Sequence, residues 1–306
     1  MSDSTASLRR QIRSAGDLQS VVRTMKTLAA SSIGQYEQAV RALGDYARTV
    51  ELGLRVCFRG SGADAALTGT PVEPDRGRDT NQIGGIVFGS DQGLVGQFND
   101  VVTDYAVQAL AALTDRPLVW AVGERVHARL TDAGLPVVGR FAVPGSVAAI
   151  TPLIGQILVA SEVRGKRVAQ LHLYYNRPAS GSGYAPVNQR LLPLDDAWQG
   201  RLAALPWPTG NLPEVIGTGA ATLSALMREY LFVSLFRACA ESLASENASR
   251  LAAMQRAEKN IDELLEALNG KFHRLRQGAI DEELFDVIAG VEALVGTRPQ
   301  HYTSGC

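Results

Sequence analysis

The sequence predicts an α/β protein in which long N- and C-terminal helices form an antiparallel two-helix coiled coil. Between them lies a small central α/β domain with a mostly parallel sheet. Apolar residues recur every 3.5 positions at both ends of the 306-residue chain, and short apolar runs alternate with helical patterns between the ends. The expected segments are the N-terminal coiled-coil helix 1–56, a Gly/Pro-rich loop 57–82, the central α/β domain 83–210, the C-terminal coiled-coil helix 211–295 and a flexible tail 296–306.

The N-terminal segment carries an apolar seam that starts at Leu8 and advances in alternating steps of four and three residues. Twelve of the fourteen seam positions up to Leu54 are apolar or aromatic, and no proline interrupts them. A helix of about 50 residues would be roughly 75 Å long. Because that exceeds the width of a small domain, we expect this helix to protrude and to pack on another helix.

The C-terminal segment repeats the pattern over a longer distance. Fourteen of seventeen seam positions between Leu223 and Ala279 are apolar or aromatic, and the seam then shifts phase and continues from Ile280 to Leu294. A continuous helix here would reach roughly 110–120 Å. Since it is longer than the first helix, its C-terminal part must stand alone or pack on another protein.

The central segment shows strands that alternate with helices, which indicates a mostly parallel sheet. We expect strands at 83–89, 117–122, 137–141, 167–175 and 187–194, the last at an edge, and helices at 101–113, 125–133 and 146–159. The uncharged stretch 141–161 is long enough to span a membrane, but its prolines and glycines favour a buried helix.

Composition excludes several classes of protein. With 46% hydrophobic and 20% charged residues the chain is not disordered, and a net charge of −1 argues against nucleic-acid binding. Three cysteines without metal-ligand spacing argue against a disulfide framework and for a reducing compartment. No signal peptide is expected at the N-terminus.

The charge is unevenly distributed along the chain. Residues 1–56 carry a net charge of +3 and residues 214–295 carry −5, which weakly favours pairing of the two end segments.

No pattern in the sequence indicates a catalytic, metal or cofactor site. The four histidines are far apart, and the acidic run 281–283 is typical of a solvated helix face. The loop 90–99 (SDQGLVGQFN) has glycines between a strand and a helix, where a phosphate could bind. It matches neither common phosphate-binding motif, so a structural turn is the better interpretation.

Four stretches resemble the gamma subunit of F-type ATP synthases. Residues 20–31 (SVVRTMKTLAAS) are similar to the family's KITxAMxMVAAS, and the loop 90–99 is similar to SDRGLCGGxN. Residues 243–254 resemble LASExxARMxAM, and residues 276–284 resemble RQAxITxEL. With the shared architecture, the resemblance covers the chain except residues 57–82 and the part after Leu294.

The resemblance implies a central-stalk rotor subunit that couples ion transport to ATP synthesis or hydrolysis by rotation. Its implied partners are the alpha and beta subunits, the epsilon subunit and the c-subunit ring. It implies no active site, metal or cofactor in this chain. Membrane association would come through the complex only, at the cytoplasmic face of the bacterial inner membrane.

The resemblance also assigns roles to individual residues. Two pairs of residues match family positions near the beta subunit: Met25 with Lys26, and Arg276 with Gln277. The matching positions of the loop motif are Ser90, Asp91, Gly93, Gly96 and Asn99. Gln92, Val95, Gln97, Gly278 and Asp281 depart from the family pattern. These departures point to a divergent bacterial form, for which an alternative ATPase is one option. The sequence does not determine whether the coupling ion is a proton or sodium.

A different class of function remains as the alternative. Apolar seams at both ends would also suit a coiled-coil adaptor or a dimerising α/β enzyme with a ligand site in the loop 90–99. Such a protein would form a symmetric homodimer, whereas a rotor subunit would bind alpha and beta chains.

Overall fold

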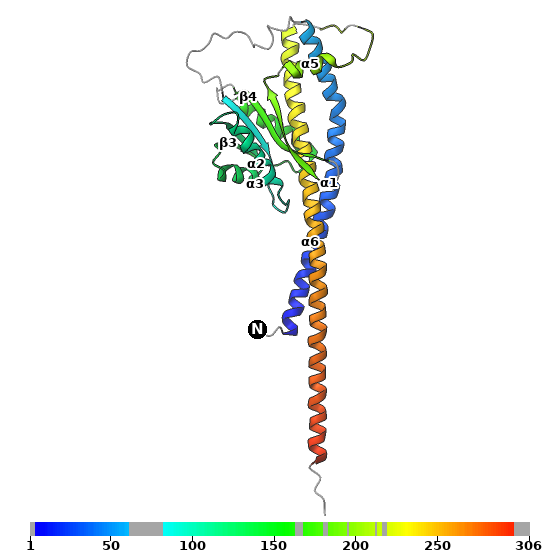
Figure 1. Cartoon of the computed structure of the whole chain (residues 1–306). Helices are drawn as coiled ribbons and strands as arrows, with labels where there is room; N and C mark the ends of the chain where they lie inside the picture. The colour runs from blue at the N-terminus through cyan, green and yellow to red at the C-terminus, as the bar shows by residue number, and fades with distance from the viewer. Residues whose placement is uncertain are drawn as a thin grey trace, which may run out of the picture. The chain divides into compact units, whose positions relative to one another are not determined.

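The computed structural model shows two long helices at the ends of the chain and a five-stranded sheet between them (Figure 1). It describes residues 4–60, 82–162, 168–179, 183–194, 196–211, 213–215 and 219–296. The elements in chain order are α1 (Thr5–Gly60), β1 (Gln82–Phe88), α2 (Phe98–Ala111), β2 (Leu118–Val122), α3 (Glu124–Asp132), β3 (Val137–Phe141), η1 (Val147–Ala149), α4 (Ile150–Glu162), β4 (Val168–Pro178), β5 (Tyr184–Leu192), α5 (Asp196–Ala204) and α6 (Gly219–Gly296).

The sheet has the strand order β3-β2-β1-β4-β5. The pairs β1–β2, β1–β4 and β2–β3 are parallel, and the edge strand β5 runs antiparallel to β4. The central strand β1 is buried along almost its whole length, because helices cover both faces of the sheet. The expected mostly parallel sheet with a final edge strand is therefore confirmed.

Two apolar cores cover the two faces of the sheet. Val87 on β1 contributes to a core with residues of α2 and α3, such as Leu110 and Leu130. On the other face, Phe88 belongs to a larger core that includes α4, α5 and parts of α1 and α6, among them Tyr230. The alternation of side chains along each strand thus joins the sheet to both helical layers.

The chain divides into two compact units. One comprises Lys26–Ala253, and the other comprises the two ends, Met1–Met25 with Met254–Cys306. In the first unit α1 and α6 are antiparallel, and the Tyr46 hydroxyl donates a hydrogen bond to Glu229 Oε2 at 2.6 Å. The sheet and the adjoining parts of both long helices therefore form one packed body.

In the second unit the ends of α1 and α6 also run antiparallel. Arg23 Nε donates to Glu258 Oε1 at 2.9 Å, and the Arg9 guanidinium lies over the Phe272 ring, 5.3 Å from its centre. Every seam position predicted in α1 is buried or half-buried. In α6 the predicted seam is covered as far as Phe272, so the predicted coiled-coil pairing is confirmed.

Some boundaries differ from the sequence prediction. Helix α1 continues to Gly60, so residues 57–60 are helical rather than part of a loop, and α6 begins at Gly219 rather than at residue 211. Buried Cys57 follows Leu54 in the seam, which explains the longer α1. Helix α5 was not expected. The remainder of the predicted loop 57–82 up to residue 81, and the predicted tail from residue 297, lie outside the described residues.

Candidate partner-binding surfaces and the junction loop

The loop that follows β1 is closed by hydrogen bonds between its two ends. The Asn99 side chain accepts a hydrogen bond from the Ser90 backbone N–H at 2.9 Å and donates one to Ser90 Oγ at 2.8 Å. Ser90 Oγ in turn donates to the Gln92 carbonyl at 2.8 Å. Ser90 and Asn99 are both buried, so these bonds fix the geometry of the turn that leads into α2.

Asp91 links this loop to two other segments at the same edge of the sheet. Its Oδ1 accepts from the backbone N–H of Glu124, the first residue of α3, at 2.9 Å. Its Oδ2 accepts from the Val143 N–H, after β3, at 2.8 Å. A carboxylate at a helix N-terminus satisfies an N–H group without an intrahelical partner and is stabilised by the helix dipole.

The two glycines of the loop motif differ in what their positions require. Gly96 has φ +57°, a left-handed conformation that disfavours residues with a Cβ. At Gly93 a Cβ would meet only the Arg125 guanidinium, at an ordinary 3.6 Å. The loop residues singled out from the sequence thus come together as a junction between strand ends and helix starts.

Two further contacts join the sheet domain to α6, within the unit Lys26–Ala253. Ser249 Oγ donates to the Val95 carbonyl at 2.5 Å. Arg177, at the end of β4, donates from Nε to Glu241 Oε2 at 2.9 Å and from Nη2 to the Tyr175 hydroxyl at 2.6 Å. Burial raises the pKa of Tyr175 to about 12, so its hydroxyl stays protonated at neutral pH. These contacts tie α6 to the sheet at two levels.

Sequence reasoning did not single out these tying residues. Ser249 lies within the stretch 243–254 that resembles the gamma family, so a signal for it existed. Arg177 and Glu241 carry no comparable signal, because an ion pair between residues 64 positions apart depends on the fold.

Met25 and Lys26, the positions matched to a beta-subunit contact, are half-buried on α1. Arg276 and Gln277 are exposed on α6, and Arg276 lies 18 residues beyond Glu258, the partner of Arg23. At about 1.5 Å per residue this separation is roughly 27 Å. Within their compact unit, Met25 therefore does not form one site with Arg276 and Gln277.

The last part of α6 has no partner among the described residues. Every residue from His273 to Glu292 is exposed. Several large apolar side chains follow helical spacing here and form a stripe, and Arg276 and Gln277 precede its first member by four and three positions. The members of this stripe are Ile280, Leu284, Val287, Ile288 and Val291, which are 45–64% exposed. An apolar stripe of this kind indicates a surface that another protein covers.

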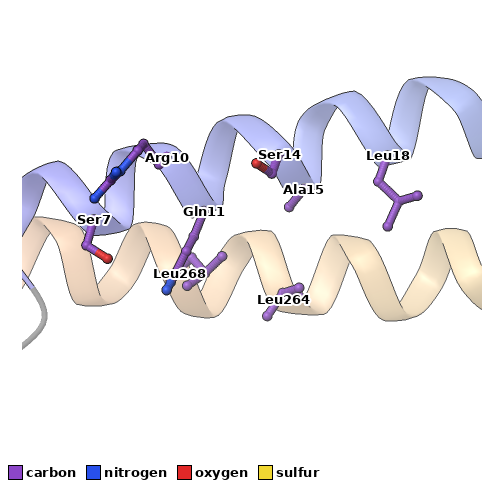
Figure 2. Close-up of a pocket in the computed structure, with 8 residues that line it drawn as sticks. All are labelled: Ser7, Arg10, Gln11, Ser14, Ala15, Leu18, Leu264 and Leu268. Carbon is purple, nitrogen blue, oxygen red and sulfur yellow. The ribbon is translucent and has the colours of Figure 1, made fainter. Parts of the chain in front are cut away.

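An apolar groove runs between the first turns of α1 and the facing part of α6. It has a volume of about 530 Å³. Figure 2 shows Gln11 and Leu18 directed from α1 towards α6, where Leu264 and Leu268 lie. Leu18 and Leu264 are about half exposed. This end of the helix pair therefore offers a second apolar surface.

The described residues contain no group of three or more His, Cys, Asp and Glu side chains placed to hold a metal ion. In the same part of the chain, no helix combines the length and the apolar character that crossing a membrane requires. The expected helix within 141–161 is present as η1 and α4, but it is buried on one face only, and Val159 is 59% exposed.

Comparison with known proteins identifies the family. The family model described as ATP synthase matches residues 4–294. The chain therefore belongs to this ATP synthase family, and the resemblance drawn from the sequence is confirmed.

The curated relatives are gamma chains. The ATP synthase gamma chain of Desulforamulus reducens is 26% identical over 95% of this chain and 99% of the relative. That of Mycolicibacterium smegmatis is 25% identical over 95% and 98%. These relatives are subunits of an enzyme complex.

Solved structures share the fold. The rotor of the Euglena gracilis mitochondrial ATP synthase contains a chain with a TM-score of 0.58 and 15% identity, covering 90% of this chain and 98% of its own. A chain of the OSCP/F1/c-ring structure from the same organism has a TM-score of 0.60, 16% identity and 99% coverage of both chains.

Proposed function

We propose that this chain is the central-stalk rotor subunit of an F-type ATP synthase. In this role it couples ion translocation through the membrane sector to ATP synthesis or hydrolysis at the beta subunits by rotating. The family match over residues 4–294 is the observation that carries the proposal. The long paired helices and the sheet domain are the parts that such a shaft needs.

The bare end of α6 suits insertion into a ring of other subunits. Its apolar stripe is unfavourable in water, since each of these half-exposed side chains forgoes roughly half of the about 1.5–3 kcal/mol that full burial contributes. Arg276 and Gln277 are exposed next to this stripe, and we infer that they hydrogen-bond a loop of a surrounding chain. We assign these two residues to beta-subunit contact, and Met25 and Lys26 to a second contact further along α1.

The junction between the sheet domain and α6 suits transmission of torque. A rotor must resist twisting between its base and its shaft, and a single apolar surface can slip. Polar ties have a fixed geometry, and here they run from Val95 to Ser249 and from Arg177 to Glu241. Asp91 and Asn99 then hold the loop that carries Val95.

We assign no catalytic site, metal or cofactor to this chain itself, because the ties at the loop 90–99 are structural. Its partners would be the alpha, beta and epsilon subunits and the c-subunit ring. The chain would lie at the cytoplasmic face of the bacterial inner membrane and would associate with the membrane through the complex.

The test compares two double variants in the assembled complex. Arg276→Ala with Gln277→Ala is expected to lower ATP hydrolysis at least about threefold, which corresponds to a loss of about 0.65 kcal/mol of interaction or more. The matched control is Gln255→Ala with Arg256→Ala, the same residue types exposed on the same helix, which is expected to leave turnover unchanged. Equal activity of the two assembled variants would remove the role of the Arg276–Gln277 pair.

Mass measurement separates this function from the adaptor or dimerising enzyme. A rotor chain is expected to be monomeric alone and to form a stable complex when alpha and beta chains are added. A stable homodimer with no affinity for either chain would overturn the rotor proposal.

A further inference from the structure

The bare end of α6, residues 273–292, is a single helix that no other described part of the chain covers. Every one of its residues is exposed, whereas Phe272, the residue before it, still lies under the Arg9 guanidinium of α1. Most helices in proteins gain their stability by packing an apolar face against a neighbour. Without such a neighbour, the bare end depends on its own backbone hydrogen bonds and on the helix propensity of its residues.

Several residues at this end are poor helix formers. A Cβ at Gly278 or Gly290 would meet no side chain beyond its sequence neighbours within 4 Å, so no close contact requires glycine there. The last turn, which ends at Gly296, has no basic residue to offset the negative end of the helix dipole. Most members of the apolar stripe are also β-branched, and such side chains lose rotamer freedom in a helix. These are Ile280, Val287, Ile288 and Val291.

The sizes of these effects decide whether the helix persists without a partner. Adding one residue to an existing helix has an equilibrium constant of only about 1–1.6, even for good helix formers. Relative to alanine, glycine lowers this constant about fivefold, and a β-branched residue lowers it by up to about threefold. The product of the constants from Gly278 to Val291 therefore falls well below 1. The start of the bare end is held because it continues the paired part of α6, so the helix opens from its C-terminal end.

Glycine has a different consequence where the two long helices are paired. Gly16 of α1 also has open space around it, but the adjacent seam residues Ala15 and Val22 are buried. Burial of the seam offsets the low helix propensity of glycine there. The bare end has no such compensation, so its conformation is set by whether something covers its apolar stripe.

We propose that the bare end of α6 is a conditionally folded segment. In the free chain its helix is open beyond Gly278, and it becomes continuous to Gly296 when a partner covers the apolar stripe. Folding and binding are then one step, and part of the binding free energy is used to order the helix. That the partner is the surrounding set of alpha and beta chains rests on the function proposed above. The state of the free chain does not depend on that function.

The first test measures backbone dynamics of the isolated full chain by NMR. Order parameters are expected to be near 0.85 in residues 251–265, where α6 is paired, and below about 0.6 in residues 280–292. The Cα chemical shifts should show a helical fraction that decreases along the bare end. Order parameters near 0.85 as far as Val291 would overturn the proposal, because the helix would then persist without a partner.

The second test makes the same substitution at two positions of the bare end. Because the helix extends from its held start, Gly278→Ala is expected to raise the helical fraction of residues 279–289 at least about twofold. Gly290→Ala acts beyond those residues and should leave their helical fraction nearly unchanged. The control Gly16→Ala changes a glycine in the paired part and should not affect the bare end. Equal effects of Gly278→Ala and Gly290→Ala on residues 279–289 would contradict opening from the C-terminal end.

The third test examines the coupling to binding, with the full chain titrated into alpha and beta chains. Gly278→Ala orders part of the segment in advance and is expected to tighten association about threefold or more, whereas Gly16→Ala should not change it. Unchanged association of a variant whose free helical fraction has risen would contradict the coupling. Absence of association even by the unaltered chain would instead overturn the rotor function, and the first two tests would still decide the state of the free chain.

Discussion

At the scale of single residues, Asp91 connects more than one part of the sheet domain through a single side chain. One carboxylate accepts hydrogen bonds from the N–H groups of Glu124 and Val143, which belong to two separate segments. The bonds to a charged acceptor are stronger than neutral ones. The residue therefore holds the start of α3 and the segment after β3 at one point of the sheet edge.

Asp91→Ala is expected to lower the free energy of unfolding by about 2 kcal/mol, since two N–H groups lose a charged acceptor. Denaturant unfolding followed by circular dichroism measures this. The control Asp104→Ala removes the same charge from an exposed position on α2 and should change stability by less than about 0.5 kcal/mol. A similar loss in both variants would show that the change in net charge, rather than the loss of the two hydrogen bonds, lowers the free energy of unfolding.

His172 gives a prediction about pH. Burial lowers its pKa below the ordinary value of 6.5, and Arg190 lowers it further, while the hydrogen bond with Asn188 raises it. The unfolded chain therefore takes up a proton near pH 6.5 that folded His172 does not. The stability contributed by neutral His172 is present above pH 6.5 and is lost as the pH falls below that value, through the lowered pKa of the folded state.

The comparison of wild type with His172→Gln isolates this effect, because glutamine retains a donor for Asn188 but does not titrate. Between pH 7 and about 5, the wild type should lose Tm more steeply than the variant. Parallel pH profiles would mean that His172 is protonated in the folded protein as readily as in the unfolded one.

The residue scale is also where sequence reasoning reached its limit. The motif resemblance located Asp91 and Asn99, whose side chains close the junction loop. It did not reveal that Arg177 and Glu241 pair, or that one buried oxygen of Glu246 has no donor among the residues that the structure describes. Such facts depend on which distant segments meet, and local spacing contains no information about that.

At the scale of elements, the 3.5-residue period predicted the long helices well. The period arises because the seam side chains are buried between the two helices. Predicted seam residues such as Val22 and Ala29 are buried, with exposed residues between them. Composition alone was misleading at residues 57–60, where glycine suggested a loop although Cys57 continues the seam. Helix α5 was missed because it is short, and only the spacing of Trp198 and Leu202 on one face signals it.

The first turns of α1 should depend on one seam residue. Leu8 is 1% exposed, and replacing it with alanine is expected to destabilise this end of the helix pair by about 2 kcal/mol. Hydrogen exchange of the amides in residues 8–16 should then be faster by about one to two orders of magnitude. The matched change Leu18→Ala, at a residue that is 52% exposed, should leave these rates nearly unchanged. Equal acceleration by both variants would argue against the seam.

At the scale of the whole molecule, the structure separates what holds the chain together from what is available to partners. Described residues after Phe272 are all exposed as far as Glu292, including the apolar stripe. These residues do not pack against other described parts of the chain, so the stability of the chain does not explain why several of them are apolar. A surrounding partner that covers these side chains does explain it.

Ending the chain after Phe272 is therefore expected to leave the Tm of the isolated protein within about 1–2 °C of the full-length value, because residues 273–292 make no buried contact. The same truncation should weaken association with alpha and beta chains at least about tenfold, since the stripe and the Arg276–Gln277 pair are removed together. Thermal unfolding and titration with the partner chains measure the two effects. A control with Leu18→Ala, which alters the other apolar surface, shows whether that groove contributes separately. Should the truncated chain lose stability while binding its partners normally, the end of α6 would belong to the fold, and the division proposed here would be wrong.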